Sequence, residues 1–139
     1  MMQHTLMDTG PLVACINRRD KHHLWARDLL GQLCPPILTC DAVLAEACFL
    51  LRGMHGGNAA LLELVRRGVL QPEFHLIEHV SSVATLMDKY ANVPMALADA
   101  CLVRMSEIYD NSRVITLDSD FHVYRRNGRQ AIPLCMPPQ

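Results

Sequence analysis

Short apolar runs alternate along this chain with longer segments in which apolar residues recur every three or four positions. The short runs are typical of buried strands and comprise Thr5–Met7, Ile37–Thr39, Val114–Leu117 and Ala131–Cys135. The longer segments predict helices from Pro11 to Ile16 and over His22–Leu33, Ala42–Arg52, Asn58–Arg67, Glu78–Tyr90 and Met95–Tyr109. Between two of these helices, Val69–Ile77 is interpreted as extended and interrupted by Pro72. Short strands alternating with helices favour an α/β fold whose parallel sheet is covered on both faces.

The composition is that of one packed domain. The chain has 139 residues, of which 50% are hydrophobic and 19% are charged, so we expect a single globular domain over residues 1–139. No apolar stretch approaches the roughly 20 residues that a membrane-spanning helix needs, and the N-terminus lacks the basic start and apolar segment of a signal peptide. We therefore expect a soluble, cytoplasmic protein.

The cysteines fit the same expectation. The six cysteines include no Cys-x-x-Cys pair, and most of them lie in apolar runs. This pattern indicates buried free thiols, which suit a reducing cytoplasm. A structural zinc site is the alternative, but the paired ligand spacing of such sites is missing.

Two carboxylates lie in helices that are otherwise apolar almost all round. Glu46 stands alone in the segment 42–51, and Asp99 stands alone in the segment 95–103. A buried carboxylate without partners costs several kcal/mol, so it needs a cation, a network of hydrogen-bond donors or a raised pKa. A satisfied structural acid, or a narrow exposed stripe on the helix, is the open alternative for each residue.

Neither helix offers these acids an obvious basic partner. Arg52 lies six positions from Glu46 and therefore off its face, and Arg104 lies five positions from Asp99 and is only marginally placed. A cation from elsewhere is the economical solution. Several hard oxygen ligands without a histidine or cysteine cluster select Mg²⁺ or Mn²⁺ over zinc, and the seven histidines show no metal-binding spacing.

Two further acids follow predicted strands. Asp8 comes directly after Thr5–Met7, and Asp118 comes directly after Val114–Leu117. Ligand sites of parallel sheets lie just beyond the carboxyl ends of the strands, so both acids stand where a site is expected. Aspartate is also a common turn and cap residue, which leaves a structural reading open for both.

The charge distribution is compatible with a polyanionic partner. The net charge is −1, but setting aside Asp8, Glu46, Asp99, Asp118 and Asp120 leaves 13 basic residues against nine of the 14 acidic ones. Basic residues that could contact phosphates cluster at Arg18-Arg19-Asp20-Lys21, at Arg66-Arg67 and at Arg125-Arg126 with Arg129. Ordinary solvated faces are the equally plain interpretation of these clusters.

Taken in order, the acids and their neighbours match one family. The motifs are Leu6-Met7-Asp8-Thr9, then Glu46 in an early helix, then Tyr90 through Pro94 into Ala98-Asp99-Ala100, and finally Thr116-Leu117-Asp118-Ser119-Asp120-Phe121. This order resembles the PIN-domain family, and within it the VapC toxins, over nearly the whole chain. The resemblance implies a three-layer α/β/α fold with a central, mainly parallel sheet of four to five short strands.

The resemblance also implies the site and the activity. By it, Asp8, Glu46, Asp99 and Asp118 form the catalytic metal-binding quartet, with Asp120 as an auxiliary metal acid. The hydroxyls of Thr9 and Thr116 match positions that orient such a site, while Gly10 departs from the polar residue that many relatives carry. The implied activity is Mg²⁺- or Mn²⁺-dependent cleavage of single-stranded or looped RNA, in which metal activates a water and the products end in 5′-phosphate and 3′-hydroxyl groups. The implied partners are the RNA substrate, a small antitoxin protein and a second copy of the chain in a homodimer.

Other functions remain to be compared with this one. A housekeeping RNA-processing PIN nuclease without an antitoxin and a non-catalytic PIN-like RNA-binding module are the two alternatives within the fold. A phosphatase of the haloacid dehalogenase class would use Asp118 and Asp120 as nucleophile and acid. That class carries its Asp-x-Asp after the first strand and needs a later lysine, whereas the only lysines here are Lys21 and Lys89.

Overall fold

Five short parallel strands form the centre of the molecule. The structure is a computed structural model that describes residues 2–139. Its main sheet has the order β3-β2-β1-β4-β7, and every neighbouring pair is parallel. The strands are β1 (His4–Met7), β2 (Ile37–Leu38), β3 (Leu70–Gln71), β4 (Ser112–Ile115) and β7 (Leu134–Cys135). The predicted α/β fold with a parallel sheet of four to five strands is confirmed.

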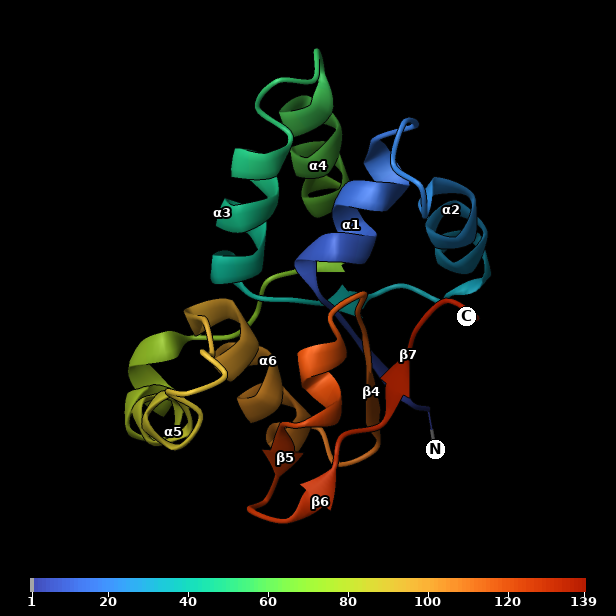
Figure 1. The fold of residues 1–139 in the computed structure, drawn as a ribbon. Helices are drawn as coiled ribbons and strands as arrows, with labels where there is room; N and C mark the ends of the chain where they lie inside the picture. Colours follow the sequence, from blue (N-terminus) through green and yellow to red (C-terminus); the bar gives the residue numbers. More distant parts are fainter. Residues whose placement is uncertain (1) are drawn as a thin grey trace.

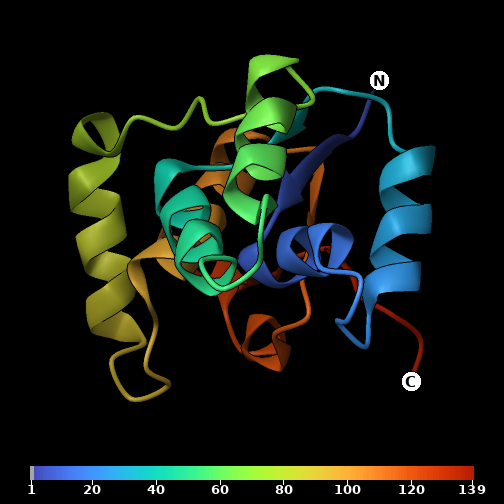
Figure 2. The same cartoon turned by 90° about the horizontal axis from the view of Figure 1, so that it is seen from above.

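Helices cover both faces of this sheet (Figure 1). The helices α1 (Thr9–Ile16), α2 (His23–Gln32), α3 (Asp41–Leu50) and α4 (Gly57–Arg66) lie on one side, in the upper half of Figure 1. On the other side lie α5 (Leu76–Lys89) and α6 (Leu97–Ile108), followed in the chain by the short 3-10 helix η1 (Ser119–His122) and the hairpin of β5 (Arg125–Arg126) and β6 (Gln130–Ala131). Seen from above, α1 and α3 lie side by side, with α5 and α2 at opposite flanks (Figure 2).

Three predicted elements differ from the observed ones in instructive ways. The predicted strand Ala131–Cys135 is two strands, because Pro133 separates β6 from β7 and the two pair with different partners. The extended segment Val69–Ile77 contains only the two-residue strand β3, and its last residues already belong to α5. The helix predicted from Met95 begins at Leu97, where the Ala96 N–H donates to Asp99 Oδ2.

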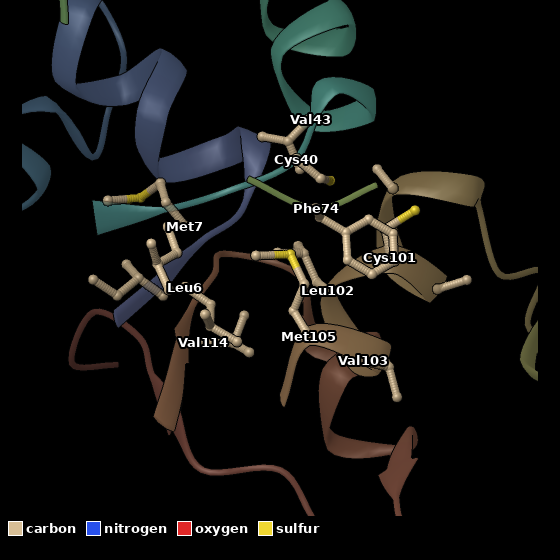
Figure 3. Close-up of a cluster of buried hydrophobic side chains, with 14 of the residues drawn as sticks. Leu6, Met7, Cys40, Val43, Phe74, Cys101, Leu102, Val103, Met105 and Val114 are labelled. Carbon is tan, nitrogen blue, oxygen red and sulfur yellow. The ribbon is translucent and has the colours of Figure 1, made fainter. Parts of the chain in front are cut away.

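The core lies between the sheet and the helices that flank it. Leu6 and Val114 from the sheet are fully buried, as are Leu102 of α6 and Val43 of α3 (Figure 3). Burying each such side chain contributes about 1.5–3 kcal/mol. Helix α6 is buried over most of its circumference, which confirms the prediction of an apolar surrounding for Asp99. The core therefore fixes the helix that carries one of the candidate acids.

The thiols and the helix lengths bear on two further predictions. Cys40 and Cys101 are buried as expected, whereas Cys34 is exposed and the other three cysteines are half-buried, so burial of the thiols is only partly confirmed. Within the described residues no disulfide is present, since all six cysteines are free. Across residues 2–139, none of the helices is both long enough and apolar enough to span a membrane.

Candidate carboxylate site

The register of two neighbouring strands brings Asp8 and Thr116 together. Strands β1 and β4 pair in parallel with Met7 opposite Ile115, so the next residue of each strand emerges at the same edge of the sheet. The Asp8 N–H donates to the Ile115 carbonyl over 3.0 Å, and Thr116 Oγ1 donates to Asp8 Oδ2 over 2.7 Å. Asp8 Oδ1 accepts from the Thr9 N–H over 2.8 Å, which caps α1. Both carboxylate oxygens are thus held in place.

Burial makes the ionised form of Asp8 costly. Asp8 is buried, with only 6% of its surface exposed to solvent. Loss of hydration raises the pKa of Asp8 from its ordinary value of 3.8 to about 6, against the opposing effect of the hydrogen bonds from Thr116 and Thr9. The negative charges of Asp99 and Glu46 add to the rise. These two acids therefore lie near enough to Asp8 to repel its charge.

Thr116 also connects Asp8 to Asp118. Thr116 Oγ1 accepts from the Asp118 N–H over 2.9 Å while its own proton goes to Asp8. Asp118 in turn caps the 3-10 helix η1 by accepting from the Asp120 N–H over 2.9 Å. Asp118 and Asp120 are half-buried. Thr116 therefore holds one oxygen of Asp8 and links the loops that follow β1 and β4.

Asp99 is held by hydrogen bonds to one of its two carboxylate oxygens. Its Oδ2 accepts from the Ala96 N–H over 3.1 Å and from the Tyr124 hydroxyl over 3.3 Å. Burial raises the pKa of Asp99, and the charges of Asp118 and Asp120 raise it further. Tyr124 is fully buried, and its ring packs edge-on against Tyr90. No sequence pattern singles out Tyr124, because only the fold brings it to a residue 25 positions away.

Glu46 lies on an exposed stripe of α3, which is one of the two alternatives that the sequence left open. The same face of α3 also exposes Phe49 and Leu50. The apolar character of the segment 42–51 therefore reflects an exposed apolar face as well as a buried one. Partial burial still raises the pKa of Glu46, as do the charges of Asp99 and Asp118. Glu46 thus borders the same acidic region from its open side.

The acids converge without a basic partner. Among residues 2–139, none of the ion pairs involves Asp8, Glu46, Asp99, Asp118 or Asp120. Within the same range, no three acidic, histidine or cysteine side chains are already grouped as metal ligands. Uncompensated carboxylates repel one another, and a bound cation would lower that repulsion. Oxygen donors of this charge fit Mg²⁺ or Mn²⁺ better than they fit a softer metal.

Two neighbours of Asp8 complete the description of the site. Thr9 Oγ1 is buried and has no hydrogen-bond partner in the described structure, so its proposed orienting role receives no support from a contact. A Cβ added at Gly10 would lie 3.2 Å from the Leu117 side chain. The glycine therefore allows α1 to approach the residue that precedes Asp118, which gives the departure at this position a packing reason.

The basic clusters contribute unequally. Arg126 was grouped with possible phosphate ligands, but it is only 5% exposed and its guanidinium donates to the carbonyls of Ser106 and Asp110. Arg66 and Arg67 both pair with Glu63 on α4. Arg18 and Arg19 are exposed at the end of α1. Neither of them forms an ion pair among the described residues, and the same is true of Arg125 and of the exposed Arg129.

Comparison with known proteins identifies the family. The PIN domain model matches residues 5–127 of the chain. The structure of VapC20 from Mycobacterium tuberculosis, a toxin that cleaves the sarcin-ricin loop, superimposes with a TM-score of 0.76 at 19% identity, covering 86% of this chain and 93% of that one. VapBC2 from Rickettsia felis, solved with a DNA fragment from its promoter, gives a TM-score of 0.61 at 14% identity, covering 96% and 98%. A search of curated proteins found no match. The family match and the shared fold agree with the acids at the strand ends, and the chain belongs to the PIN-domain family.

Proposed function

We propose that this protein is a metal-dependent endoribonuclease that acts as the toxin of a toxin–antitoxin pair in the cytoplasm. The observation that carries the proposal is that Asp8 and Asp118, which follow β1 and β4, lie near enough to Glu46 and Asp99 for charge repulsion to raise the pKa of Asp8, Glu46 and Asp99. Among residues 2–139 these acids form no ion pair. Membership of the PIN-domain family and the shared fold with VapC20 support the same activity. The acids proposed to act are Asp8, Glu46, Asp99, Asp118 and Asp120.

The acids are proposed to bind the metal, and neighbouring groups orient two of these acids through hydrogen bonds. Asp8, Glu46, Asp99 and Asp118 would bind Mg²⁺ or Mn²⁺, with Asp120 as an additional acid. When bound, such a cation lowers the pKa of a water and neutralises charge on a phosphodiester. Thr116 and the Thr9 N–H hold Asp8, while Tyr124 and the Ala96 N–H hold Oδ2 of Asp99. The Oδ1 atom of Asp99 accepts none of these bonds, which leaves it for a ligand.

The raised pKa values give the acids a further role. Asp8 titrates near pH 6, so it is mostly ionised at neutral pH but can take up a proton at mildly acidic pH. A carboxylate that is ionised at a cost in stability gains most when a cation neutralises it. The cluster of negative charges thus lowers the stability of the metal-free protein and favours the binding of a cation.

The proposed partners follow from the relatives and from the chemistry. The substrate is RNA with unstacked nucleotides, because single-stranded and looped segments expose their bases to side chains. The Rickettsia felis relative is a VapBC assembly, which supports a small VapB-type antitoxin as the inhibitor of this chain. An antitoxin arginine placed among the acids would replace the cation as their counter-charge. The active form is proposed to be a homodimer.

Cleavage of a mixed RNA pool by the purified protein tests the function. The reaction is run with Mn²⁺, with Mg²⁺ and with EDTA, using wild type, Asp8→Asn, Asp99→Asn and the control Asp28→Asn. Asp28 is an exposed acid on α2 that pairs with Arg27. Its substitution therefore removes one negative charge at a position away from the site. We expect cutting that needs metal, that is lost in the two site variants and that persists in the control.

Three results would redirect the proposal. Equal cutting by wild type and both site variants would assign the activity to a contaminant. Absence of cutting by wild type under every metal condition would favour a PIN-like RNA-binding module. Activity that no co-expressed antitoxin inhibits would favour a housekeeping nuclease.

A further inference from the structure

An exposed aromatic side chain lies one helical turn from Glu46, one of the candidate acids. Phe49 is three positions after Glu46 on α3, and Leu50 is four positions after it, so all three share one face of the helix. Phe49 is 60% exposed and Leu50 is 52% exposed. Three residues correspond to about 4.5 Å along a helix axis. The aromatic ring is therefore a near neighbour of the candidate site on its open side.

A guanidinium is stacked on this ring. The Arg52 Cζ atom lies 3.8 Å from the centre of the Phe49 ring, and Arg52 also donates to the Phe49 carbonyl over 2.6 Å. An aromatic face and an arginine plane are the two surfaces on which proteins stack unpaired bases. The stack thus combines an apolar surface with a positive charge. A contact with an apolar protein surface would not require that charge.

A basic hollow continues the same surface. It has a volume of about 520 Å³ and is lined by Asn17, Arg18, Arg19, Leu50, Gly53, Met54 and His55. Leu50 belongs to both the exposed face of α3 and the hollow, so the two are continuous. In the described residues, the lining contains no acidic side chain, and neither Arg18 nor Arg19 forms an ion pair. Asp20, the nearest acid in sequence, instead accepts from the His22 N–H.

Helices α1 and α3 set the spacing between the acids and the hollow. The two helices lie side by side, with their N-terminal ends toward the sheet and their C-terminal ends in the upper part of Figure 1. Asn17 and Leu50, at these C-terminal ends, line the same hollow. Asp8 caps the first end of α1, and Asn17 follows its last residue. The eight residues of α1 correspond to about 12 Å. The acids and the free cations therefore stand at opposite ends of one short surface.

We propose that this surface is a binding track for single-stranded RNA, in which Phe49 and Arg52 stack a base next to the carboxylates and Arg18 and Arg19 contact phosphates in the hollow. The inference rests on the proposed function, because it takes RNA as the substrate. It adds which way the RNA leaves the site: along α3 and toward the end of α1. Charge complementarity selects RNA as the occupant, since the hollow offers unpaired cations beside an exposed aromatic ring.

Binding of a fluorescent, mixed-sequence single-stranded RNA, followed by anisotropy in EDTA, tests the track apart from cleavage. We expect Phe49→Ala to weaken binding about 10-fold and Phe49→Trp to preserve it, because stacking of a base on an aromatic ring depends on the ring. Ile77→Ala is the control, since Ile77 is 83% exposed on α5, away from the track. Thermal unfolding checks that each variant is folded.

The phosphate contacts have their own readout. The double variant Arg18→Ala/Arg19→Ala should weaken binding and reduce the salt dependence of log K by about 1.4, at about 0.7 for each lost contact to single strands. Arg66→Ala/Arg67→Ala is the matched control, because it removes the same charge from arginines that Glu63 already pairs. Its salt dependence should equal that of wild type.

The outcomes separate the track from the nuclease. If wild type cuts RNA with Mn²⁺ but Phe49→Ala and the Arg18/Arg19 variant bind RNA like wild type, the track is wrong and the function stands. If wild type never cuts but these variants lose binding, the track stands and the function is wrong. A Phe49→Ala variant that binds RNA normally but changes the molar mass of the protein in light scattering would assign the surface to a protein contact and overturn the inference.

Discussion

Thr116 Oγ1 donates a hydrogen bond to Asp8 Oδ2 over 2.7 Å, and the two residues follow adjacent parallel strands. The same hydroxyl accepts from the Asp118 N–H over 2.9 Å. One threonine therefore orients an acid from each of the two loops that carry the proposed metal ligands. The pairing register of β1 and β4 is what makes this contact possible.

Thr116→Val removes this link with little change in volume. We expect a loss of about 1–3 kcal/mol in the free energy of unfolding, because a buried acceptor and an N–H donor lose their partner. RNA cleavage should fall about 10- to 100-fold, as is usual when a residue that orients a metal ligand is lost. Urea unfolding and cleavage rates measure the two effects. Thr116→Ser should restore both, and a valine variant as active as wild type would refute the orienting role.

Asp8→Asn should stabilise the metal-free protein at neutral pH. Asp8 has a folded pKa of about 6 against an ordinary value of 3.8, so the folded state retains a proton that the unfolded state has released. Its contribution to stability is therefore present at low pH, falls as pH rises through about 6, and costs up to about 3 kcal/mol above that. The contribution of asparagine to stability does not change with pH in this way, because its side chain does not titrate.

The comparison is made by urea unfolding in EDTA between pH 4 and pH 8. The stability of Asp8→Asn minus that of wild type should increase with pH and level off above about pH 7. A difference that stays constant with pH would show that burial does not raise the pKa of Asp8.

Tyr124→Phe should weaken the hold on Asp99 without opening the core. The hydroxyl of Tyr124 donates to Asp99 Oδ2 over 3.3 Å, and its removal raises the pKa of Asp99 because that bond favours the ionised form. We expect about 10-fold more Mn²⁺ to be needed for half-maximal cleavage. Tyr90→Phe is the control, because the Tyr90 hydroxyl accepts from the Arg125 N–H instead. An equal Mn²⁺ requirement in the two variants would contradict the role of Tyr124.

Glu46→Gln separates a functional acid from a structural one. Glu46 is exposed and takes part in none of the hydrogen bonds or ion pairs found among residues 2–139, so its substitution should change the free energy of unfolding by less than about 0.5 kcal/mol. Cleavage should nevertheless fall by at least about 10-fold, since a ligand charge is lost. Retained cleavage in a stable Glu46→Gln protein would remove Glu46 from the site.

The positions of the acids could be predicted better than their surroundings. Asp8 was placed correctly at the end of β1, because a short apolar run that stops at aspartate encodes both the strand and its end. Asp118 was expected directly after a strand but lies three residues beyond β4, which ends at Ile115, and caps η1 instead. The sequence could not decide whether Glu46 is buried or exposed, because an apolar helix in a sequence does not reveal which of its faces the fold leaves uncovered. Phe49, on the uncovered face of α3, is 60% exposed for this reason.

Contacts between distant segments were outside the reach of the sequence. Tyr124 reaches Asp99, and Arg126 is buried against Ser106, only because η1 and the β5–β6 hairpin fold back onto α6. No spacing rule relates these residues. The arginine pair at 125–126 therefore looked like a surface cluster, although one of its members satisfies backbone carbonyls inside the protein.

Calorimetric titration of the purified protein with Mn²⁺ tests most directly whether the acids form one cation site, because it needs no knowledge of the RNA target. We predict that wild type and Asp28→Asn bind Mn²⁺ alike, and that Asp8→Asn and Asp99→Asn each bind it at least about 10-fold more weakly. Binding by both site variants that equals binding by wild type would contradict a metal centre built from these carboxylates.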